Sequence, residues 1–130
     1  MKIFAFTDTH GDEKLINKIL LQIKKESPNI VVCAGDISDL SKNLKNLIFK
    51  FKIANIPFLI IPGNHETIEE IKNICEKTNF AIPLHRSAYE VGNYIFFGYG
   101  TGGFDKINKN FEKLTIKFKE KINENKKVIL

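Results

Sequence analysis

Three short apolar runs, each followed by apolar residues at helical spacing, constrain the fold of this chain more than any other feature of its sequence. Runs that are apolar at nearly every position suit strands buried on both faces, as in parallel sheets covered by helices. We therefore predict an α/β fold with a parallel β-α-β-α-β core and helices on the sheet faces. The runs are residues 2–6, 30–34 and 58–61, and the helical stripes fall within 15–23, 40–51 and 71–75.

Polar residues mark the expected helix starts. Thr67 and Glu70 have the spacing of a capping box ahead of the third helix. Asp12 is expected to cap the first helix and Ser41 the second, because Asp and Ser side chains accept backbone N–H groups at that position. Glu66 is interpreted as a charge at the start of the third helix, where the helix dipole favours acids.

The pattern changes after residue 79, where we expect a hairpin, a glycine-rich loop and one more helix. Gly92-Asn93 between two apolar segments is typical of a two-residue hairpin turn. The glycine-rich loop lacks the Lys-Ser/Thr pair of a Walker-type phosphate loop. Without repeats or linkers, residues 1–130 are expected to form a single domain. The predicted elements are strands 89–91 and 94–97, the loop 98–103, a helix with apolar residues from 107 to 122, and a strand over 128–130.

The net charge of +5 comes from lysines spread along the whole chain, with Arg86 the single arginine. Nucleic-acid surfaces favour clustered basic residues, often Arg, so a nucleic-acid partner is allowed but not favoured. No apolar run approaches the roughly 20 residues that span a bilayer, and no membrane partner is expected. Cys33 and Cys75 lie in apolar patterns, without a Cys or His nearby at zinc-site spacing. Two buried free thiols, and hence a reducing cytoplasm, are predicted.

All three expected strands end in polar residues that a metal could bind. Ligands of open parallel sheets bind beyond the carboxyl ends of the strands, and the regular spacing of positions 8, 36 and 64 places these ends at one rim. Neighbouring carboxylates repel each other unless a cation lies between them. A mixed Asp, His and Asn set suits Mn, Fe, Ni or Zn better than Ca or Mg. Asp8 with His10 could instead cap the turn into the first helix, and Asp36 could cap a helix. The candidate residues are Asp8, His10, Asp36, Asp39, Asn64 and His65.

The segments FTDTHGD, CAGDISD and IPGNHE resemble the D-x-H, G-D-x-x-D and G-N-H-E motifs of the calcineurin-like metallophosphoesterase superfamily. The three occur in the right order, each at the end of an expected strand, and the resemblance extends over essentially the whole chain. It implies a layered metallophosphoesterase-like fold and metal-dependent hydrolysis of phosphomonoesters or phosphodiesters. The substrate would be a phosphate-ester small molecule, attacked by a metal-bound hydroxide.

Carried over residue by residue, the resemblance implies a two-metal site with a proton donor beside it. One or two divalent transition-metal ions would be the cofactor. His65 would be the catalytic acid that protonates the leaving oxygen, and Asp39 would orient and polarise its ring. The metal ligands would be Asp8 and His10 for the first ion, Asp36 bridging both ions, and Asn64 for the second ion.

The chain lacks three histidines that the superfamily carries in its C-terminal part, one after a strand and two in a G-H-x-H motif. It holds His10, His65 and His85 alone. Two explanations remain open: the chain is the N-terminal part of a longer domain, or it is a natural short form whose degenerate site serves as an interaction module. As it stands, we expect at most one well-held metal, at the position of Asp8, His10 and Asp36.

Three residues outside the ligand set bear on the function. Leu40 stands where Ser/Thr protein phosphatases of the superfamily have Arg, so a protein-phosphatase role is not expected. His85 and Arg86 have no partner in the sequence pattern and are expected to be surface or rim residues. A nuclease is a further alternative, which the positive charge alone supports.

Overall fold

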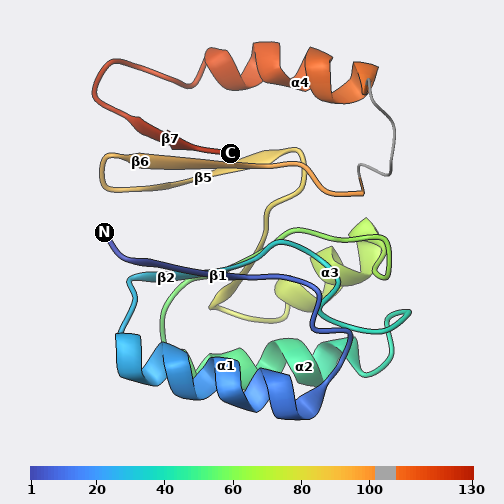
Figure 1. The fold of residues 1–130 in the computed structure, drawn as a ribbon. Helices are drawn as coiled ribbons and strands as arrows, with labels where there is room; N and C mark the ends of the chain where they lie inside the picture. Colours follow the sequence, from blue (N-terminus) through green and yellow to red (C-terminus); the bar gives the residue numbers. More distant parts are fainter. Residues whose placement is uncertain (102–107) are drawn as a thin grey trace.

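A computed structural model describes residues 1–101 and 108–130, and four of its strands form a parallel sheet (Figure 1). The strands lie in the order β1-β2-β3-β4, and the register pairs Phe6 with Cys33 and Cys33 with Ile60. The predicted parallel β-α-β-α-β core is therefore confirmed. The strands are β1 (Ile3–Phe6), β2 (Ile30–Cys33), β3 (Phe58–Ile60) and β4 (Ala81–Pro83).

Three helices cover one face of this sheet. Their apolar stripes pack against alternate strand residues, such as Val31, Cys33 and Phe58, to form the main core. Within this core, the rings of Phe51 and Phe58 stack with their centroids 4.3 Å apart. Figure 1 shows α1 and α2 below the sheet. The helices are α1 (Glu13–Glu26), α2 (Leu44–Lys50), which continues as the short 3-10 helix η1 (Phe51–Ala54), and α3 (Ile68–Cys75).

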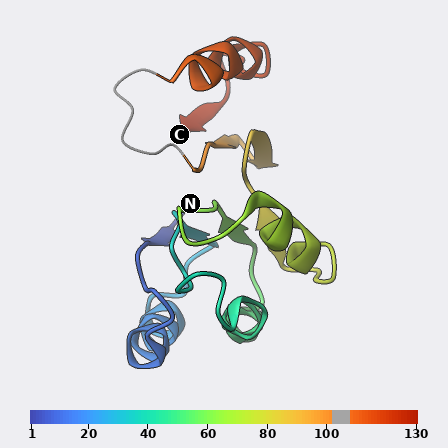
Figure 2. The same cartoon turned by 90° about the vertical axis from the view of Figure 1, so that its right-hand side faces the viewer.

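The opposite face of the first sheet packs against a second sheet, so the layers run helix, sheet, sheet, helix (Figures 1 and 2). Ile30 and Leu59 meet Phe96 of the second sheet in a separate apolar cluster. β5 and β6 form the predicted hairpin, and β7 runs parallel to β6. α4 lies on the outer face, where Phe118 stacks on Phe97 with 4.2 Å between ring centroids. These elements are β5 (Ser87–Val91), β6 (Tyr94–Gly98), α4 (Lys109–Lys119) and β7 (Lys127–Ile129).

The last helix is shorter than the apolar pattern that predicts it. α4 begins after its cap, Asn108, and ends before Ile122. Ile107, the first residue of the predicted stripe, and Gly102 and Gly103 of the glycine-rich loop lie outside the described residues. Within the described part of the chain, the predicted helix and the strand after it are both present, and the strand begins one residue earlier than predicted.

Two of the three predicted helix starts are confirmed. The side chain of Asp12 accepts the backbone N–H groups of Lys14 at 2.8 Å and Leu15 at 3.1 Å. Thr67 and Glu70 form the capping box that their spacing predicts. Local side-chain chemistry therefore sets where α1 and α3 begin.

The predicted start of the second helix is wrong. Ser41 lies in a loop, and α2 begins after Asn43, whose side chain makes no capping hydrogen bond within the described part of the chain. The Ser41 hydroxyl donates instead to the Glu70 carboxylate at 2.7 Å, at the start of α3. Leu40, the first residue of the predicted stripe, is 68% exposed. The loop between β2 and α2 is therefore held by the segment that follows β3.

Cys33 and Cys75 are buried free thiols, as the sequence predicts. Burial raises the pKa of both thiols to about 12, so neither is a thiolate near neutral pH. They serve the core as small apolar side chains. Among the described residues, we find no helix with the length and apolar character needed to cross a membrane.

Candidate metal centre

Beyond their last paired residues, β1 and β2 remain joined by backbone hydrogen bonds, which bring their polar ends together. The Asp8 N–H donates to the Gly35 carbonyl at 3.1 Å, and the His10 N–H donates to the Asp36 carbonyl at 2.9 Å. Thr9, between them, is 2% exposed and donates its hydroxyl to a backbone carbonyl of the second loop at 2.9 Å. These hydrogen bonds therefore hold the two loops side by side, so that the candidate ligands on them lie close together.

Three residues at these strand ends hold left-handed backbone conformations. The φ angle is +54° at Asp8, +45° at His10 and +51° at Asp36. Residues other than glycine rarely adopt this region, although Asp and His do so more often than most. Each such residue costs on the order of 1 kcal/mol or more, and such strain clusters at functional sites. Ser27 and Asn55, at helix ends, share this conformation, so the strain supports a role for the three strand-end residues only together with the contacts of their side chains.

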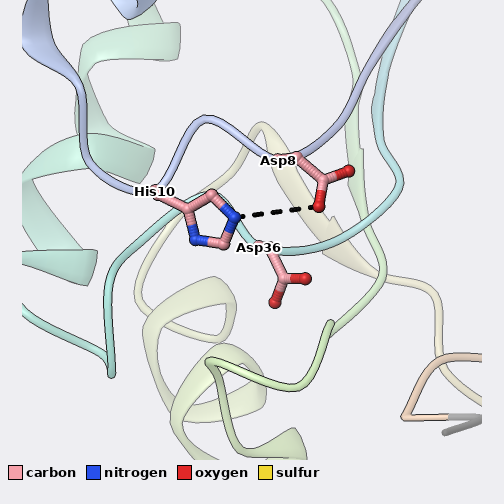
Figure 3. A group of neighbouring side chains, drawn as sticks. All are labelled: Asp8, His10 and Asp36. Atoms are coloured by element: carbon pink, nitrogen blue, oxygen red, sulfur yellow. Dashed lines mark ion pairs between the residues drawn. The ribbon is translucent and has the colours of Figure 1, made fainter.

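The side chains of Asp8, His10 and Asp36 converge at the rim (Figure 3). One ligand atom from each lies within 4.8 Å of the other two, and His10 Nε2 is 3.8 Å from Asp8 Oδ1. Two carboxylates and an imidazole suit a divalent first-row cation, and three protein ligands leave room for water or substrate. The residues present therefore fit a metal ion.

His65 lies next to this group. Its ring meets the ring of His10 edge-on with centroids 4.6 Å apart, and its backbone N–H donates to Asp36 Oδ1 at 2.9 Å. Its Nδ1 is 3.3 Å from Asp39 Oδ1 and 3.3 Å from the backbone nitrogen of Leu40. These contacts are alternatives, because Nδ1 accepts from Leu40 when it is unprotonated and donates to Asp39 when it carries a proton. The structure thus brings His65 and Asp39 together, and the position of the ring proton selects the partner.

Asn64 reaches the same rim through its neighbours in the chain. It is exposed, and it lies between Gly63, which packs against Asp36, and His65, which donates to Asp36. The other five predicted site residues make direct side-chain or ring contacts with one another, whereas Asn64 is placed by the residues on either side of it.

The loops after β2 and β3 cross so closely that both need glycine. A Cβ on Gly35, which has a φ angle of +112°, would lie 2.9 Å from the Gly63 Cα. A Cβ on Gly63 would overlap the Asp36 carboxylate and lie 2.6 Å from the Asp36 backbone nitrogen. A side chain at either position would therefore separate the loop that bears Asp36 from the loop that bears Asn64.

Glu66 belongs to this centre, and its interpretation as a helix-start charge is wrong. The acids in the first turn of α3 are Glu69 and Glu70. Glu66 is 4% exposed, and its carboxylate turns to the loop after β2, where it accepts backbone N–H groups of Asp36 and Ser38. The sequence contains one weak signal for this role, which is the position of Glu66 directly after Asn64 and His65.

β4 adds a fourth strand end, which carries His85 and Arg86. The His85 Nδ1 accepts the backbone N–H of Gly100 at 3.0 Å, and the ring stacks on Tyr99 with 5.4 Å between centroids. Its Nε2 is buried and has no hydrogen-bond partner among the described residues. Burial, followed by the positive charge of Arg86, lowers the pKa of His85 below its ordinary value. His85 is thus half-buried against the second sheet, and Arg86 is exposed as predicted.

The candidate centre is an open rim, and it shares no residue with the lining of an apolar cavity elsewhere in the described part of the chain. That cavity, of about 710 Å³, lies between α1 and η1 and is lined by side chains such as Leu20, Leu21 and Ile53. Its lining includes Asn17, Lys24 and Ser27 but no carboxylate or imidazole among the described residues, so it lacks the ligands that a divalent first-row metal prefers. The converging ligand atoms of Asp8, His10 and Asp36 therefore make the rim the candidate site.

One family profile and two curated relatives match this chain. The profile, described as calcineurin-like phosphoesterase, matches residues 1–130. A probable glycerophosphodiester phosphodiesterase, GpdQ, of Arcobacter nitrofigilis is 38% identical over 76 residues, which are 56% of this chain and 28% of that protein. An uncharacterized metallophosphoesterase, Cj0846, of Campylobacter jejuni is 32% identical over 98 residues, which are 67% of this chain and 26% of that protein. The chain therefore spans about a quarter of the length of these relatives.

A solved structure shares the fold at low sequence identity. The protein TT1561 of Thermus thermophilus superposes with a TM-score of 0.64 at 16% identity, over 75% of this chain and 48% of that chain. At this identity the likeness concerns the fold alone. Together with the family profile, it confirms the predicted layered α/β fold class.

Proposed function

Because the chain belongs to the calcineurin-like phosphoesterase family, we propose that it hydrolyses a phosphomonoester or phosphodiester with a divalent metal held at the strand-end rim. The observation that carries the proposal is the convergence of Asp8, His10 and Asp36, whose ligand atoms lie within 4.8 Å of one another. The substrate would be a phosphate-ester small molecule. The name of the Arcobacter relative makes diesters the first class to test.

Asp8, His10 and Asp36 would hold the first ion, and Asn64 would join Asp36 at a second position. The candidate ions are Mn, Fe, Ni and Zn, with Mn the first to test. Bound there, a divalent ion supplies the positive charge that activates water and neutralises the phosphate. The first position has two carboxylates, whereas the second shares one carboxylate and adds a neutral amide. We therefore expect the first position to hold its ion more tightly.

His65 would deliver the proton to the leaving oxygen. When its Nδ1 donates to Asp39, 3.3 Å away, Nε2 is the nitrogen left for proton transfer to the substrate. Asp39 would orient the ring in this way, as carboxylates commonly do for imidazoles. The edge-on contact with His10 keeps the ring of His65 beside the proposed metal ligands.

An interaction module with a degenerate site is the alternative, since the chain spans about a quarter of its curated relatives. The contact of His65 with Asp39 favours the enzyme, because a scaffold has no need of a proton donor with an orienting carboxylate. A nuclease has the lysine-rich charge as its support, and that charge is diffuse. The buried free thiols support a place in the reducing cytoplasm.

The test is hydrolysis of bis(p-nitrophenyl) phosphate and p-nitrophenyl phosphate by the purified chain with and without Mn²⁺. We expect slow, Mn²⁺-dependent release of nitrophenol, because the first metal position has its three ligands. If the chain binds Mn²⁺ but hydrolyses neither ester, the interaction module is the better explanation.

His65→Ala tests the proton donor with two kinds of leaving group. An alkyl diester such as a glycerophosphodiester needs its leaving oxygen protonated, so we expect a loss of about 10²–10⁴-fold, the range for one acid–base group. Nitrophenolate leaves readily without a proton, so the loss with the aryl diester should be much smaller. His85→Ala, which removes a histidine outside the ligand group, is the matched control. Equal losses with both esters would contradict the role of His65.

A further inference from the structure

Glu66 carries a buried carboxylate that both strand-end loops share. Its Oε2 accepts the backbone N–H groups of Asp36 at 3.1 Å and Gly63 at 3.2 Å. Its Oε1 accepts the backbone N–H and the hydroxyl of Ser38, both at 2.8 Å. A buried carboxylate is costly unless donors surround it, and hydrogen bonds to an ionised acceptor are stronger than neutral ones. Four donors on one side chain therefore make a strong joint between the loops.

The exchange between the loops runs in both directions. The Glu66 carboxylate, in the loop after β3, accepts the backbone N–H of Asp36. In return, Asp36 Oδ1, in the loop after β2, accepts the backbone N–H of His65 at 2.9 Å. Each loop is thus fixed by a carboxylate from the other. Asp36, whose φ angle of +51° is strained, is held by its backbone and its side chain at once.

We propose that Glu66 is a positioning residue that holds Asp36 in register with Asn64 and His65, so that the metal ligands and the proton donor share one geometry. Glu66 contributes no atom to the group of three ligands, and it acts through the backbone of Asp36 and Gly63. The inference rests on the proposed function, since it concerns how the same site is built.

Glu66→Gln tests the carboxylate with almost no change in shape. Gln has one acceptor oxygen, so its NH₂ group must face either the Asp36 and Gly63 N–H groups or the Ser38 N–H. Either orientation sets two donors against each other in a buried site and separates the loops. Glu69→Gln is the matched control, because it makes the same substitution at an exposed position in the first turn of α3.

The first measurement is Mn²⁺ affinity by titration calorimetry. We expect Glu66→Gln to bind about 10- to 100-fold more weakly than wild type, the range for residues that support metal ligands from outside. Ser38→Ala removes the hydroxyl, one of the four donors, and keeps the carboxylate, so its loss should be smaller. Glu69→Gln should match the wild type.

The second measurement is amide hydrogen exchange on the metal-free protein. The amides of Asp36, Ser38 and Gly63 lie in loops, yet each donates to Glu66, so we expect them to be protected in the wild type. In Glu66→Gln they should lose this protection, while amides of α1 such as Ile19 keep theirs. That contrast separates a loosened joint from a loss of global stability.

Equal Mn²⁺ affinity in Glu66→Gln and wild type overturns the inference and leaves the proposed function intact. Fast exchange at all three loop amides of the wild type also overturns it. If Glu66→Gln does not fold, two results decide whether the inference holds. They are the protection of the three loop amides in the wild type and a smaller loss of Mn²⁺ affinity in Ser38→Ala. If the wild type does not bind Mn²⁺, the proposed metal site fails, and the amide exchange alone decides whether Glu66 holds the loops.

Discussion

Four parallel strands end at one rim, and the first three ends are built differently from the fourth. At the ends of β1 and β2, the side chains of Asp8, His10 and Asp36 point toward one another. At the end of β4, the His85 Nδ1 accepts the backbone N–H of Gly100, and its Nε2 is buried. A histidine after a parallel strand is therefore not a ligand by position alone. The contacts of its two ring nitrogens decide its role.

The two kinds of strand end also connect different parts of the molecule. The loops after β1, β2 and β3 bind one another, and their contacts surround Asp36. The end of β4 joins the two sheets, because the Arg86 N–H donates to the Gly98 carbonyl at 2.8 Å. The loop after β3 makes one such contact too, since the Thr101 N–H, after β6, donates to the Pro62 carbonyl at 3.2 Å. One set of contacts builds the centre, and the other fixes the second sheet beside it.

Asp36→Ala should have the largest effect, because it removes both a proposed metal ligand and the acceptor of the His65 N–H. We expect titration with Mn²⁺ to show a stoichiometry near one in the wild type and no measurable binding in the variant. His85→Ala should bind Mn²⁺ as the wild type does, since its ring faces the second sheet. Tight binding of two Mn²⁺ ions by the wild type, or weaker binding in His85→Ala, would contradict the proposed difference between the fourth strand end and the first three.

Gly63→Ala should have a smaller effect, on both stability and metal binding. Its Cβ would overlap the Asp36 carboxylate, so we expect a loss of about 1–3 kcal/mol in the free energy of unfolding and weaker Mn²⁺ binding. Gly92→Ala, in the hairpin, has open space but a φ angle of +56°, so strain alone should cost about 1 kcal/mol. Urea unfolding and calorimetry measure both quantities. Wild-type Mn²⁺ affinity in Gly63→Ala would show that the loops can separate without harm to the centre.

The sequence predicts the strand ends well because their pattern is local. Continuous apolar runs identify β2 and β3, and the parallel arrangement then brings Asp8 and Asp36 to one edge without further information. β4 escapes the prediction because it is short and contains Pro83, which pairs with Ile60 at the edge of the sheet. Prolines are tolerated on edge strands, but they weaken the strand pattern in the sequence.

The remaining features depend on segments that are far apart in the chain. Three of the four donors to the Glu66 carboxylate come from Asp36 and Ser38, which precede it by 30 and 28 residues. The Ser41 hydroxyl does not cap α2 and donates instead to the carboxylate of Glu70, 29 residues later. An apolar pattern also says that Leu59 is buried without saying whether a helix or a sheet covers it. Hydrophobicity encodes burial, and the partner in that burial is set by the tertiary fold.

The smallest effect we predict is a pH dependence of stability at His85. Burial, and then the charge of Arg86, lowers the pKa of His85 in the folded protein, which therefore favours the neutral ring. In the unfolded chain the ring takes up a proton near pH ~6.5. Protonation then stabilises the unfolded state, so the free energy of unfolding should fall as the pH drops below about 6.5, until the pKa of the folded state is reached.

His85→Gln isolates this contribution, because Gln stays neutral over the whole range. Urea unfolding of both proteins at about pH 7.5 and about pH 5.5 should show a smaller acid loss in the variant. All other titratable groups are the same in both proteins, so their contributions cancel when the two losses are compared. The Gly100 N–H adds a reason for the expected sign, since it needs an unprotonated Nδ1 to accept it. If the free energy of unfolding falls by the same amount in both proteins, the fold does not favour the neutral form of His85. The fourth strand end would then differ from the other three in its contacts alone.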